Sequence, residues 1–550
     1  MRATELIITS IVLFLCLPCD ARVITIDNNG LADFATVQAA IDDANNGDVV
    51  VVQPGTYTGP DNRNVDFKGK AITLRSTDPK DPNIVAATII DCNGTRSEPH
   101  RGFYFHSEED ANSIIAGLTV INGVAWKGGA VLCSHSSPAF INCVFASNEA
   151  YDDDTGGGAM YNEDCSPTLI DCLFTDNEAM PSASYGGGMT NNTSSPTLTN
   201  CTFINNRAWS GGGIYNTENS SPKLTKCTFT GNAAYRGGGI TCGRGNAILS
   251  NCSFIDNSAS DYGGGLHNMI AGNTTLLSCT FSGNSAGSDG GGMFNGYNNS
   301  APTLLNCTFS GNNAEGDGGA MYNMYSRPIL TNCIFSRNSA RYGGGISIDW
   351  CSYSIITNCI FISNSADISG GGMNNYDCCF GDSTLTNCIF WNNSDSGGMG
   401  ESAQIYNHEG YGSCNPAINY SCVQEGYPGV GNIDVDPLFV DPCNGDYHLK
   451  SQAGRWDAGS GSWGVDDVTS LCIDAGDPAS PIGHEPFPNG GIVNMGAYGG
   501  TAKASKSWFG GPPCQRIVAG DVNGDCVVDF RDLAFVTMHW LEDNSNTKEP

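Results

Sequence analysis

The chain is poor in basic residues, with 25 Lys and Arg against 56 Asp and Glu and a formal net charge of −31. Contacts with phosphate groups need Lys and Arg, so this balance argues against binding to nucleic acid. Charged residues make up only 15% of the chain, whereas 71 of its 550 residues are Gly. This composition disfavours a helical protein and favours a turn-rich β architecture.

Long apolar runs are missing from most of the sequence. Residues 1–21 contain Arg2, an apolar run over 6–17 and the small residue Ala21, which is typical of a secretory signal peptide. The run is too short to cross a bilayer, and no later stretch of 18 residues is apolar. We therefore predict a secreted or cell-surface protein with no transmembrane segment after signal removal, in a compartment where disulfides persist.

What the sequence has in abundance is one repeated motif, Cys-x-Phe-x-x-Asn, followed by a glycine-rich triplet. Its ten cysteines are spaced 25 to 29 residues apart, and they are Cys143, Cys172, Cys201, Cys227, Cys252, Cys279, Cys307, Cys333, Cys359 and Cys388. A period of this size indicates a solenoid. Short stretches of alternating apolar and polar residues, with Gly triplets that a helix would not tolerate, favour a β solenoid.

One repeat shows how a coil would close. Alternation places Leu198, Cys201, Phe203 and Ile214 inside, and Asn200 is suited to a left-handed bend that resets the alternation. Each repeat then provides about three short strands and three bends, which is one coil of a parallel β-helix.

Stacked coils bring equivalent side chains to about 4.8 Å from one another. We expect Phe to stack on Phe, Cys on Cys, and residues such as Asn206 to form amide ladders. Residues 23–440 would give roughly 15 coils. Phe34, Val37, Ile41 and Ala44 recur at helical spacing and predict an amphipathic helix that covers the first coil.

Two resemblances follow from these motifs. The segment TVQAAIDDANNGDVVVVQPGTY resembles the start of bacterial proteins of the pectin-lyase-like superfamily, and the GGAV, GGGAM, GGGIY and FxxN pairs over about residues 126–395 resemble the repeats of chlamydial polymorphic outer-membrane proteins. The first implies an all-β, right-handed, single-stranded parallel β-helix. The second implies a role in adhesion.

The expected organisation has six parts. They are a signal peptide (1–21), an N-terminal cap with the first coils (22–125), the repeats (126–395), the last coils with a C-terminal cap (396–508), a Gly/Pro linker (509–513) and a calcium-binding, α-helical module (514–550).

The ten repeated cysteines are predicted to be buried free thiols, because stacked parallel strands do not favour disulfide torsion angles. Other cysteines lie outside this ladder. By proximity alone the plausible pairs are Cys414–Cys422, Cys443–Cys472 and Cys514–Cys526, but spacing does not determine the connectivity.

The segment GDVNGDCVVDFRDLAFVTMHWLE has oxygen ligands at the spacing of a calcium loop. Positions one, three, five, seven, nine and twelve are Asp521, Asn523, Asp525, Val527, Asp529 and Asp532, where Val527 would supply its carbonyl. Ca²⁺ is therefore the expected metal. The segment resembles a type I dockerin repeat, which implies a cohesin-like partner; a lone calcium-stabilised cap or anchoring tail is the alternative.

Two functions remain open. Polygalacturonase-type Gly-His-Gly and Arg-Ile-Lys motifs and a lyase-type Arg-x-Pro-x-x-Arg motif are absent, Lys and Arg are scattered, and the repeats show no local break. The sequence therefore predicts no catalytic residue and favours a non-catalytic β-helix that binds a polysaccharide or cell-surface glycan. The alternative is a polysaccharide lyase or glycoside hydrolase of the same fold.

Aromatic residues beside the glycine motif are the candidate contacts for sugar. We expect them to point outward, where they either line a stacking face for sugars or are simply exposed aromatic residues on a β surface. They are Tyr161, Trp209, Tyr215, Tyr235, Tyr262 and Tyr322.

Overall fold

The computed structural model describes residues 21–151, 156–180, 184–217, 219–269, 272–296, 300–376, 383–408, 414–508 and 530. These residues form two compact units. The larger is Ala21–Val435 with Met495–Ala497, and the smaller contains, within the described ranges, Asp436–Asn494 and residues 498–508. None of the helices within the described ranges is long and apolar enough to cross a membrane.

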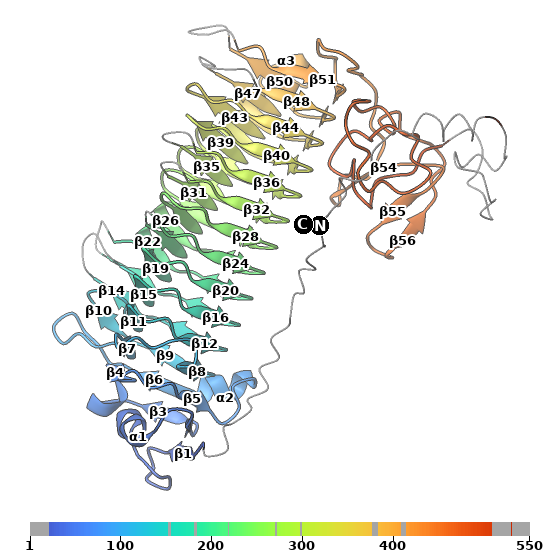
Figure 1. Cartoon of the computed structure of the whole chain (residues 1–550). Helices are drawn as coiled ribbons and strands as arrows, with labels where there is room; N and C mark the ends of the chain where they lie inside the picture. Colours follow the sequence, from blue (N-terminus) through green and yellow to red (C-terminus); the bar gives the residue numbers. More distant parts are fainter. Residues whose placement is uncertain are drawn as a thin grey trace. The chain divides into compact units, whose positions relative to one another are not determined.

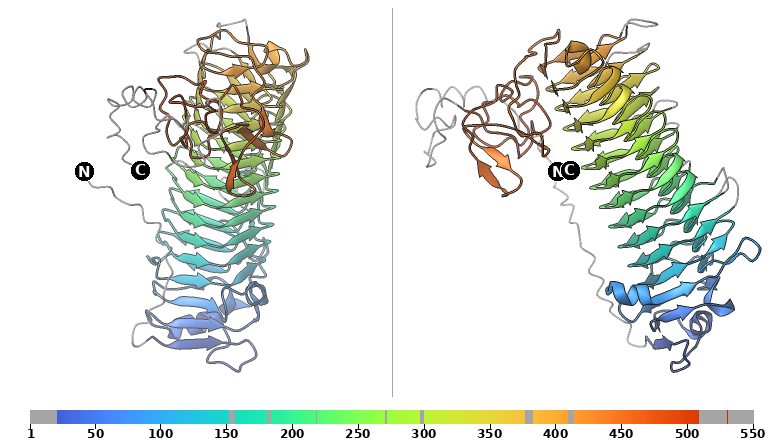
Figure 2. Two further views of the ribbon diagram at one scale, coloured as in Figure 1. Left: turned by 90° about the vertical axis from the view of Figure 1, so that its right-hand side faces the viewer. Right: turned by 180° about the vertical axis from the view of Figure 1, so that it is seen from behind.

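The larger unit is a parallel β-helix, as the sequence predicts (Figure 1). Four sheets of 15, 14, 13 and 10 described strands run along the stack, and each strand pairs in parallel with the equivalent strand of the next coil. Figure 2 shows this stacking from two further sides. About 13 coils have strands on at least three sides. The predicted number of about 15 was slightly high, because the end coils form strands on only part of their circumference.

Two sheets hold the strands that flank the repeated cysteine. The 15-stranded sheet consists of β1 (Val23–Ile26), β2 (Val49–Val52), β5 (Thr73–Ser76), β8 (Ile114–Ala116), β12 (Ala139–Ile141), β16 (Thr168–Ile170), β20 (Thr197–Thr199), β24 (Lys223–Thr225), β28 (Ile248–Ser250), β32 (Thr275–Leu277), β36 (Thr303–Leu305), β40 (Ile329–Thr331), β44 (Ile355–Thr357), β48 (Thr384–Thr386) and β51 (Ala417–Asn419). The 14-stranded sheet consists of β3 (Gly55–Tyr57), β6 (Thr88–Asp91), β9 (Thr119–Ile121), β13 (Val144–Ala146), β17 (Leu173–Thr175), β21 (Thr202–Ile204), β25 (Thr228–Thr230), β29 (Ser253–Ile255), β33 (Thr280–Ser282), β37 (Thr308–Ser310), β41 (Ile334–Ser336), β45 (Ile360–Ile362), β49 (Ile389–Trp391) and β52 (Cys422–Val423).

The other two sheets lie on either side of the glycine motif. The ten-stranded sheet consists of β10 (Val124–Ala125), β14 (Glu149–Ala150), β18 (Glu178–Ala179), β22 (Arg207–Ser210), β26 (Ala233–Arg236), β30 (Ser258–Ala259), β34 (Ser285–Ala286), β38 (Asn313–Ala314), β42 (Ser339–Tyr342) and β46 (Ser365–Ser369). The 13-stranded sheet consists of β4 (Val65–Asp66), β7 (Phe103–Phe105), β11 (Val131–Ser134), β15 (Met160–Glu163), β19 (Met189–Asn192), β23 (Ile214–Asn216), β27 (Ile240–Cys242), β31 (Leu266–Asn268), β35 (Met293–Asn295), β39 (Met321–Met324), β43 (Ile346–Asp349), β47 (Met373–Asn375) and β50 (Ile405–Asn407).

A central coil confirms the predicted inward residues and corrects the number of strands. Leu198, Cys201, Phe203 and Ile214 are all buried, and Asn200 has the expected positive φ of 54°. The coil has four strands, β20 to β23, where about three were expected. The extra strand is β22, which forms because residues between the ladder asparagine and the glycines also pair with the next coil.

The interior consists of side-chain ladders, as predicted. The rings of Phe254 and Phe281 stack with centroids 4.5 Å apart and planes 2° apart. In the amide ladder, Asn257 Nδ2 donates to Asn284 Oδ1 at 3.0 Å, and its own Oδ1 accepts from Asn232 Nδ2 at 2.9 Å. The repeated packing gives one continuous apolar core along the stack.

Helices are short and few among the described residues. They are α1 (Val37–Asp43), α2 (Pro82–Ala87), α3 (Glu401–Gln404) and the 3-10 turn η1 (Pro60–Asn62). The predicted N-terminal helix is α1, which packs its buried residues Val37 and Ile41 against the first two strands, β1 and β2. It covers the end of the core that no preceding coil shields.

The ten ladder cysteines are buried free thiols, as predicted. The suggested Cys414–Cys422 pair is wrong, because Cys414 is disulfide-bonded whereas Cys422 is a thiol. Cys443 and Cys472 do not form a disulfide with each other. Cys422 is buried, and it pairs in the sheet with Ile389 of the neighbouring coil. The predicted pair Cys514–Cys526 lies outside the described residues.

The smaller unit is irregular. It contains two antiparallel pairs of strands, β53 (Phe439–Asp441) with β54 (Asp446–Leu449), and β55 (Arg455–Asp457) with β56 (Ser462–Gly464). The predicted signal peptide up to residue 20 and the predicted calcium module over 514–550, apart from Phe530, lie outside the described part of the chain.

Candidate functional site

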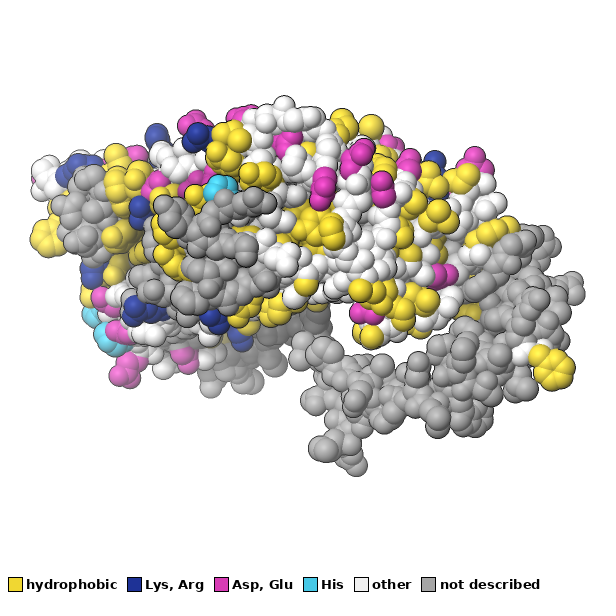
Figure 3. Space-filling model, turned by 90° about the horizontal axis from the view of Figure 1, so that it is seen from above, with side chains coloured by type: hydrophobic (Ala, Val, Ile, Leu, Met, Phe, Trp, Pro, Cys, Tyr) yellow, Lys and Arg dark blue, Asp and Glu magenta, His cyan; other side chains and the backbone are white. Residues whose placement is uncertain are grey.

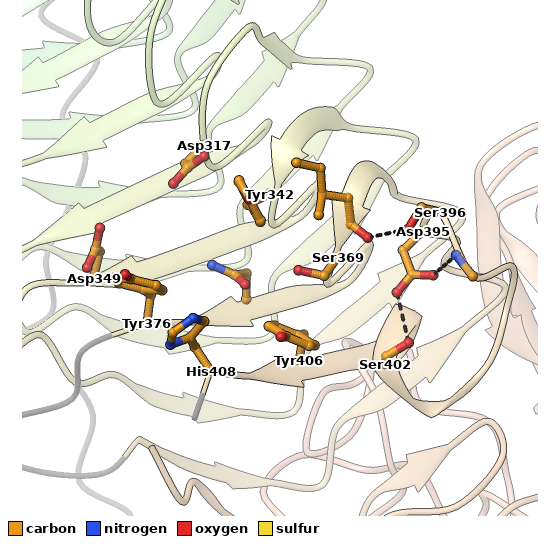
Figure 4. A pocket seen from close by; sticks show the side chains of 13 residues that line it. Asp317, Tyr342, Asp349, Ser369, Tyr376, Asp395, Ser396, Ser402, Tyr406 and His408 are labelled. Atoms are coloured by element: carbon orange, nitrogen blue, oxygen red, sulfur yellow. Dashed lines mark hydrogen bonds between the residues drawn. The ribbon is translucent and has the colours of Figure 1, made fainter. Parts of the chain in front are cut away.

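A groove of about 600 Å³ lies near the C-terminal coils of the β-helix (Figure 4). Tyrosine and aspartate side chains dominate its lining, so we call it the tyrosine–aspartate groove. Its lining residues are Asp317, Tyr342, Asp349, Ile368, Ser369, Asn374, Tyr376, Asp395, Ser396, Gly397, Ser402, Tyr406 and His408.

Successive coils supply these side chains in columns. Asp317 pairs with Tyr342, and Tyr342 pairs with Ser369, so these three residues occupy one position in three stacked coils, directly before the glycine motif. A second column starts at Asp349, the last residue of β43, and continues with Tyr376 and His408, each of which directly follows its strand. The number of residues in one coil therefore sets how far apart in the sequence the residues of each column lie.

A β-bulge interrupts the regular strand pairing between coils at this point. Between Ala340 and Tyr342 of β42 the pairing with β46 shifts by one residue, so that β46 has five residues and presents Ile368 to the groove. Bulges of this kind redirect side chains and are frequent beside functional sites. The expectation that no repeat is locally broken was wrong, because a single inserted residue within a short strand leaves the Cys-x-Phe-x-x-Asn motif intact.

The loop that follows β49 forms a further wall of the groove, beside the two columns. The Asp395 carboxylate accepts hydrogen bonds from the N–H of Gly397 at 2.7 Å and from Ser402 Oγ at 2.9 Å, and Ser396 Oγ donates to the carbonyl of Ile368 at 2.8 Å (Figure 4). These contacts hold the loop against the bulge and define one side of the groove.

Burial and the carboxylates in neighbouring coils raise the pKa of Asp317, one of the residues that line the groove. Burial, reinforced by the nearby Asp289 and Asp349 carboxylates, raises the pKa of Asp317 to about 7. Burial also raises the pKa of Asp289. Asp349 is itself 7% exposed and accepts a hydrogen bond from Tyr322 Oη at 3.0 Å. At neutral pH, a partly protonated carboxyl therefore lies close to buried carboxylates.

One polar atom in the groove has no protein partner among the described residues. Ser369 Oγ is fully buried, the residue is 6% exposed, and no hydrogen bond to it is formed. A buried hydroxyl without a partner is costly, so this atom is positioned for a ligand or a water molecule.

The aspartate cluster was not predicted from the sequence. Asp289, Asp317 and Asp349 are 28 and 32 residues apart, and no short motif joins them. Their spacing lies close to the coil period, and Asp289 and Asp317 both directly precede a glycine motif. A search for acidic residues recurring at the period of the repeat would have found them.

A second hollow of about 440 Å³ lies over β18, β22, β26 and β30 of the ten-stranded sheet. We call it the tryptophan groove. The rings of Trp209 and Tyr235 stack there with centroids 4.3 Å apart, and Trp209 is 40% exposed. Arg207 and Met180 complete its rim. Two of the predicted stacking residues therefore do meet in one groove.

The other predicted aromatics differ in exposure. Tyr161 and Tyr322 are buried, at 4% and 5%, which contradicts the expected outward position. Tyr161 lies beneath the Lys127 ammonium, and the hydroxyl of Tyr322 is hydrogen-bonded to Asp349. Neighbouring coils cover both rings. Tyr215 and Tyr262 are partly exposed and stack on rings of adjacent coils, Tyr185 and Phe294 respectively.

The predicted calcium ligands cannot be placed. Asp521, Asn523, Asp525, Val527, Asp529 and Asp532 all lie outside the described residues. Within the described ranges, no group of three or more His, Cys, Asp or Glu side chains has metal-binding geometry. The aspartates of the tyrosine–aspartate groove are therefore not a ready-made metal site.

Comparison with known proteins supports the fold. The family model described as "Right handed beta helix region" matches residues 83–276 and 269–415. Among solved structures, the pectate lyase Pel9A is 13% identical over 86% of this chain and 96% of its own, with a TM-score of 0.32, and a rhamnogalacturonan lyase is 14% identical over 67% and 87%, with a TM-score of 0.25. At these TM-scores the two structures carry no conclusion about this chain, and the support for the fold is the family match. No curated protein matches the chain.

Proposed function

The chain belongs to the right-handed β-helix family, and we propose that it is a secreted, glycan-binding member whose tyrosine–aspartate groove holds a segment of a polysaccharide chain. The observation that supports this most directly is the composition of the groove. Exposed tyrosine rings stand beside carboxylates in a hollow of about 600 Å³.

This combination suits a carbohydrate. The apolar face of a pyranose packs on an aromatic ring, and carboxylate oxygens accept hydrogen bonds from sugar hydroxyls. Tyr376, which is 38% exposed, lies beside His408 with ring centroids 4.3 Å apart and planes tilted by 47°, and it offers such a platform. The unpartnered hydroxyl of Ser369 is a further hydrogen-bonding group. The tryptophan groove provides a second aromatic platform along the same sheet.

Binding to soluble polysaccharides by affinity electrophoresis or calorimetry tests the proposal. Tyr376→Ala should weaken binding at least tenfold, since it removes the platform. Tyr325→Ala is a matched control, because Tyr325 is also 38% exposed but does not line the groove. Equal loss in both variants, or no binding by the intact protein to any neutral or acidic polymer, would refute the proposal.

A second function, glycoside hydrolysis, is favoured by the Asp317–Asp349 pair. Hydrolysis needs one carboxyl that is protonated, to donate its proton to the leaving glycosidic oxygen, and one carboxylate that accepts a proton from the attacking water. A pKa of about 7 would keep Asp317 partly protonated at neutral pH, and Asp349 lines the same groove. A lyase whose base is Lys or Arg is less well supported, because neither residue is among the described residues that line the groove.

New reducing ends measure this second function. If the groove hydrolyses glycans, Asp317→Asn should lower the rate at least 100-fold, whereas Asp395→Asn, which can keep the hydrogen bonds of the loop, should retain most of it. If no product forms at an enzyme level where a known glycosidase clears the polymer, hydrolysis is refuted and glycan binding remains as the proposed function.

Secretion and the C-terminal tail complete the proposal. Residues 1–21 would direct export, and a calcium-stabilised, dockerin-like tail over 514–550 would anchor the β-helix, through a cohesin-like partner or as a simple attachment. The spacing of six oxygen ligands supports calcium.

A further inference from the structure

The electrostatics of the tyrosine–aspartate groove define which glycans it can hold. We propose that the groove selects glycan chains that lack carboxylate and sulfate groups and rejects polyuronates. This inference rests on the proposed function and specifies its substrate class.

Acidic side chains surround the groove on three sides. Asp317 and Asp349 belong to the two columns of the floor, and Asp395 belongs to the loop wall. Asp289 lies in the coil below, close enough to act on Asp317. A bound anion would lie beside the carboxyl groups of Asp317, Asp349 and Asp395, which all line the groove, and like charges repel strongly where protein excludes water.

Basic groups offset this charge only in part. None of the described residues that line the groove is Lys or Arg, and Arg341, whose charge does reach Asp317, is exposed and lies over the ring of Tyr342. The chain segments that directly follow Tyr376 and His408, residues 377–382 and 409–413, also contain no Lys or Arg in their sequence. A polyuronate has one carboxylate per sugar and would need several such partners.

Polar and aromatic groups, in contrast, suit an uncharged sugar. The buried and unpartnered Ser369 hydroxyl can donate to a ring or hydroxyl oxygen, and the carboxylates can accept from sugar hydroxyls. Tyr342, Tyr376 and Tyr406 supply apolar faces. The face drawn in Figure 3 shows the same mixture on a larger scale, with acidic and hydrophobic side chains side by side.

Polymer pairs that share a backbone and differ chiefly in charge test the inference. Suitable pairs are hydroxyethylcellulose with carboxymethylcellulose, highly methyl-esterified pectin with polygalacturonate, and the propylene glycol ester of alginate with alginate. At low ionic strength the uncharged member of a pair that binds should bind at least about tenfold more tightly, and the difference should shrink as salt screens the repulsion.

Charge variants identify the groups responsible. Asp349→Asn combined with Asp395→Asn should bring the affinity for the anionic polymer to within about threefold of the neutral one. Asp176→Asn with Asp256→Asn is the matched control, because it removes the same charge from exposed positions beside β17 and β29, away from the groove. Equal or tighter binding of the anionic member by the unmodified protein overturns the inference but leaves the proposed function intact. Binding of neither member in any pair overturns both.

Discussion

The backbone N–H of Asp317 donates a hydrogen bond to the Asp289 carboxylate at 2.8 Å, so that two carboxyl groups lie one above the other in consecutive coils. In the interior, the ladders of Phe, Cys and Asn stack identical side chains at no electrostatic cost. At Asp289 and Asp317, the same stacking of equivalent positions brings together carboxyl groups that repel each other. The β-bulge and the tyrosine–aspartate groove lie in the coils that follow.

The first prediction concerns pH. Asp317 has a folded-state pKa of about 7 against an ordinary aspartate pKa of 3.8, so the native state holds a proton that the unfolded chain releases above about pH 4. This contribution to stability is present below pH 4 and is lost as pH rises through 7, and a shift of this size corresponds to an upper bound of roughly 4 kcal/mol. Asp317→Asn should therefore gain stability relative to the unmodified protein between pH 5 and pH 8.

Thermal unfolding midpoints of both proteins at pH 5 and pH 8 measure that gain. Asp256→Asn, at an exposed position, is the control for the loss of one charge. A difference between Asp317→Asn and the unmodified protein that stays constant over this pH range would contradict the assignment. Burial raises the pKa values of Asp474 and Glu485 to about 6 and about 7. These two groups should make stability fall in the same way as pH rises, and this pH dependence should persist in the Asp317→Asn variant.

The second prediction concerns the amide ladder. Asn257 accepts hydrogen bonds from the N–H and Nδ2 of Asn232 and donates to Asn284 Oδ1, all within the buried interior. Asn257→Ala leaves these partners buried and unsatisfied, which should cost about 2–4 kcal/mol. Chemical denaturation measures the loss. Lys223→Ala, on the exposed face of β24, should change stability by less than about 0.5 kcal/mol.

The third prediction concerns the glycine motif. A Cβ on Gly213 would lie 2.7 Å from the carbonyl oxygen of Gly239 and 2.8 Å from the ring of Phe229, although the backbone of Gly213 needs no positive φ. Gly213→Ala should thus separate two coils and destabilise the β-helix by about 2 kcal/mol or more. Gly400→Ala has open space around the new carbon and should be nearly neutral. A variant Gly213→Ala that unfolds at the temperature of the unmodified protein would show that the coils are less tightly stacked.

The fourth prediction concerns the thiols. The ten ladder cysteines are buried, and burial raises the pKa of Cys388 to about 12, so a thiol reagent should not react with the ladder in the native protein. In denaturant without reductant, at least ten thiols per chain should react. A titration that finds almost none under these conditions would mean that the ladder is oxidised.

The fifth prediction concerns the tail. Calcium should raise the stability of the segment that contains Asp521 and Asp525, and chelation should reverse the effect. Asp521→Ala should abolish the calcium response, whereas Asp543→Ala, outside the ligand spacing, should preserve it. An unchanged response in Asp521→Ala would argue against the site.

Sequence and structure agree best where one local rule repeats. Leu198, Cys201 and Phe203 were placed inside from alternation alone, because a β-strand has a period of two and Asn200 marks the bend. The same argument missed β22, since its pairing depends on the next coil. It also misplaced Tyr161 and Tyr322, since the burial of an aromatic ring depends on the neighbouring side chains, Lys127 and Asp349, that cover it.

The sequence by itself determined the β-helix, its stacked ladders and its N-terminal helix, because these depend on periodicity, backbone bends and the self-packing of identical residues. Only the tertiary structure decided where the regular pairing between coils is interrupted and the groove forms. The bulge opposite Tyr342 and the meeting of Asp289, Asp317 and Asp349 depend on the register between coils, which brings together residues about one coil apart. A residue's own neighbours in the chain do not encode that register, so the candidate site emerged only when the coils were stacked.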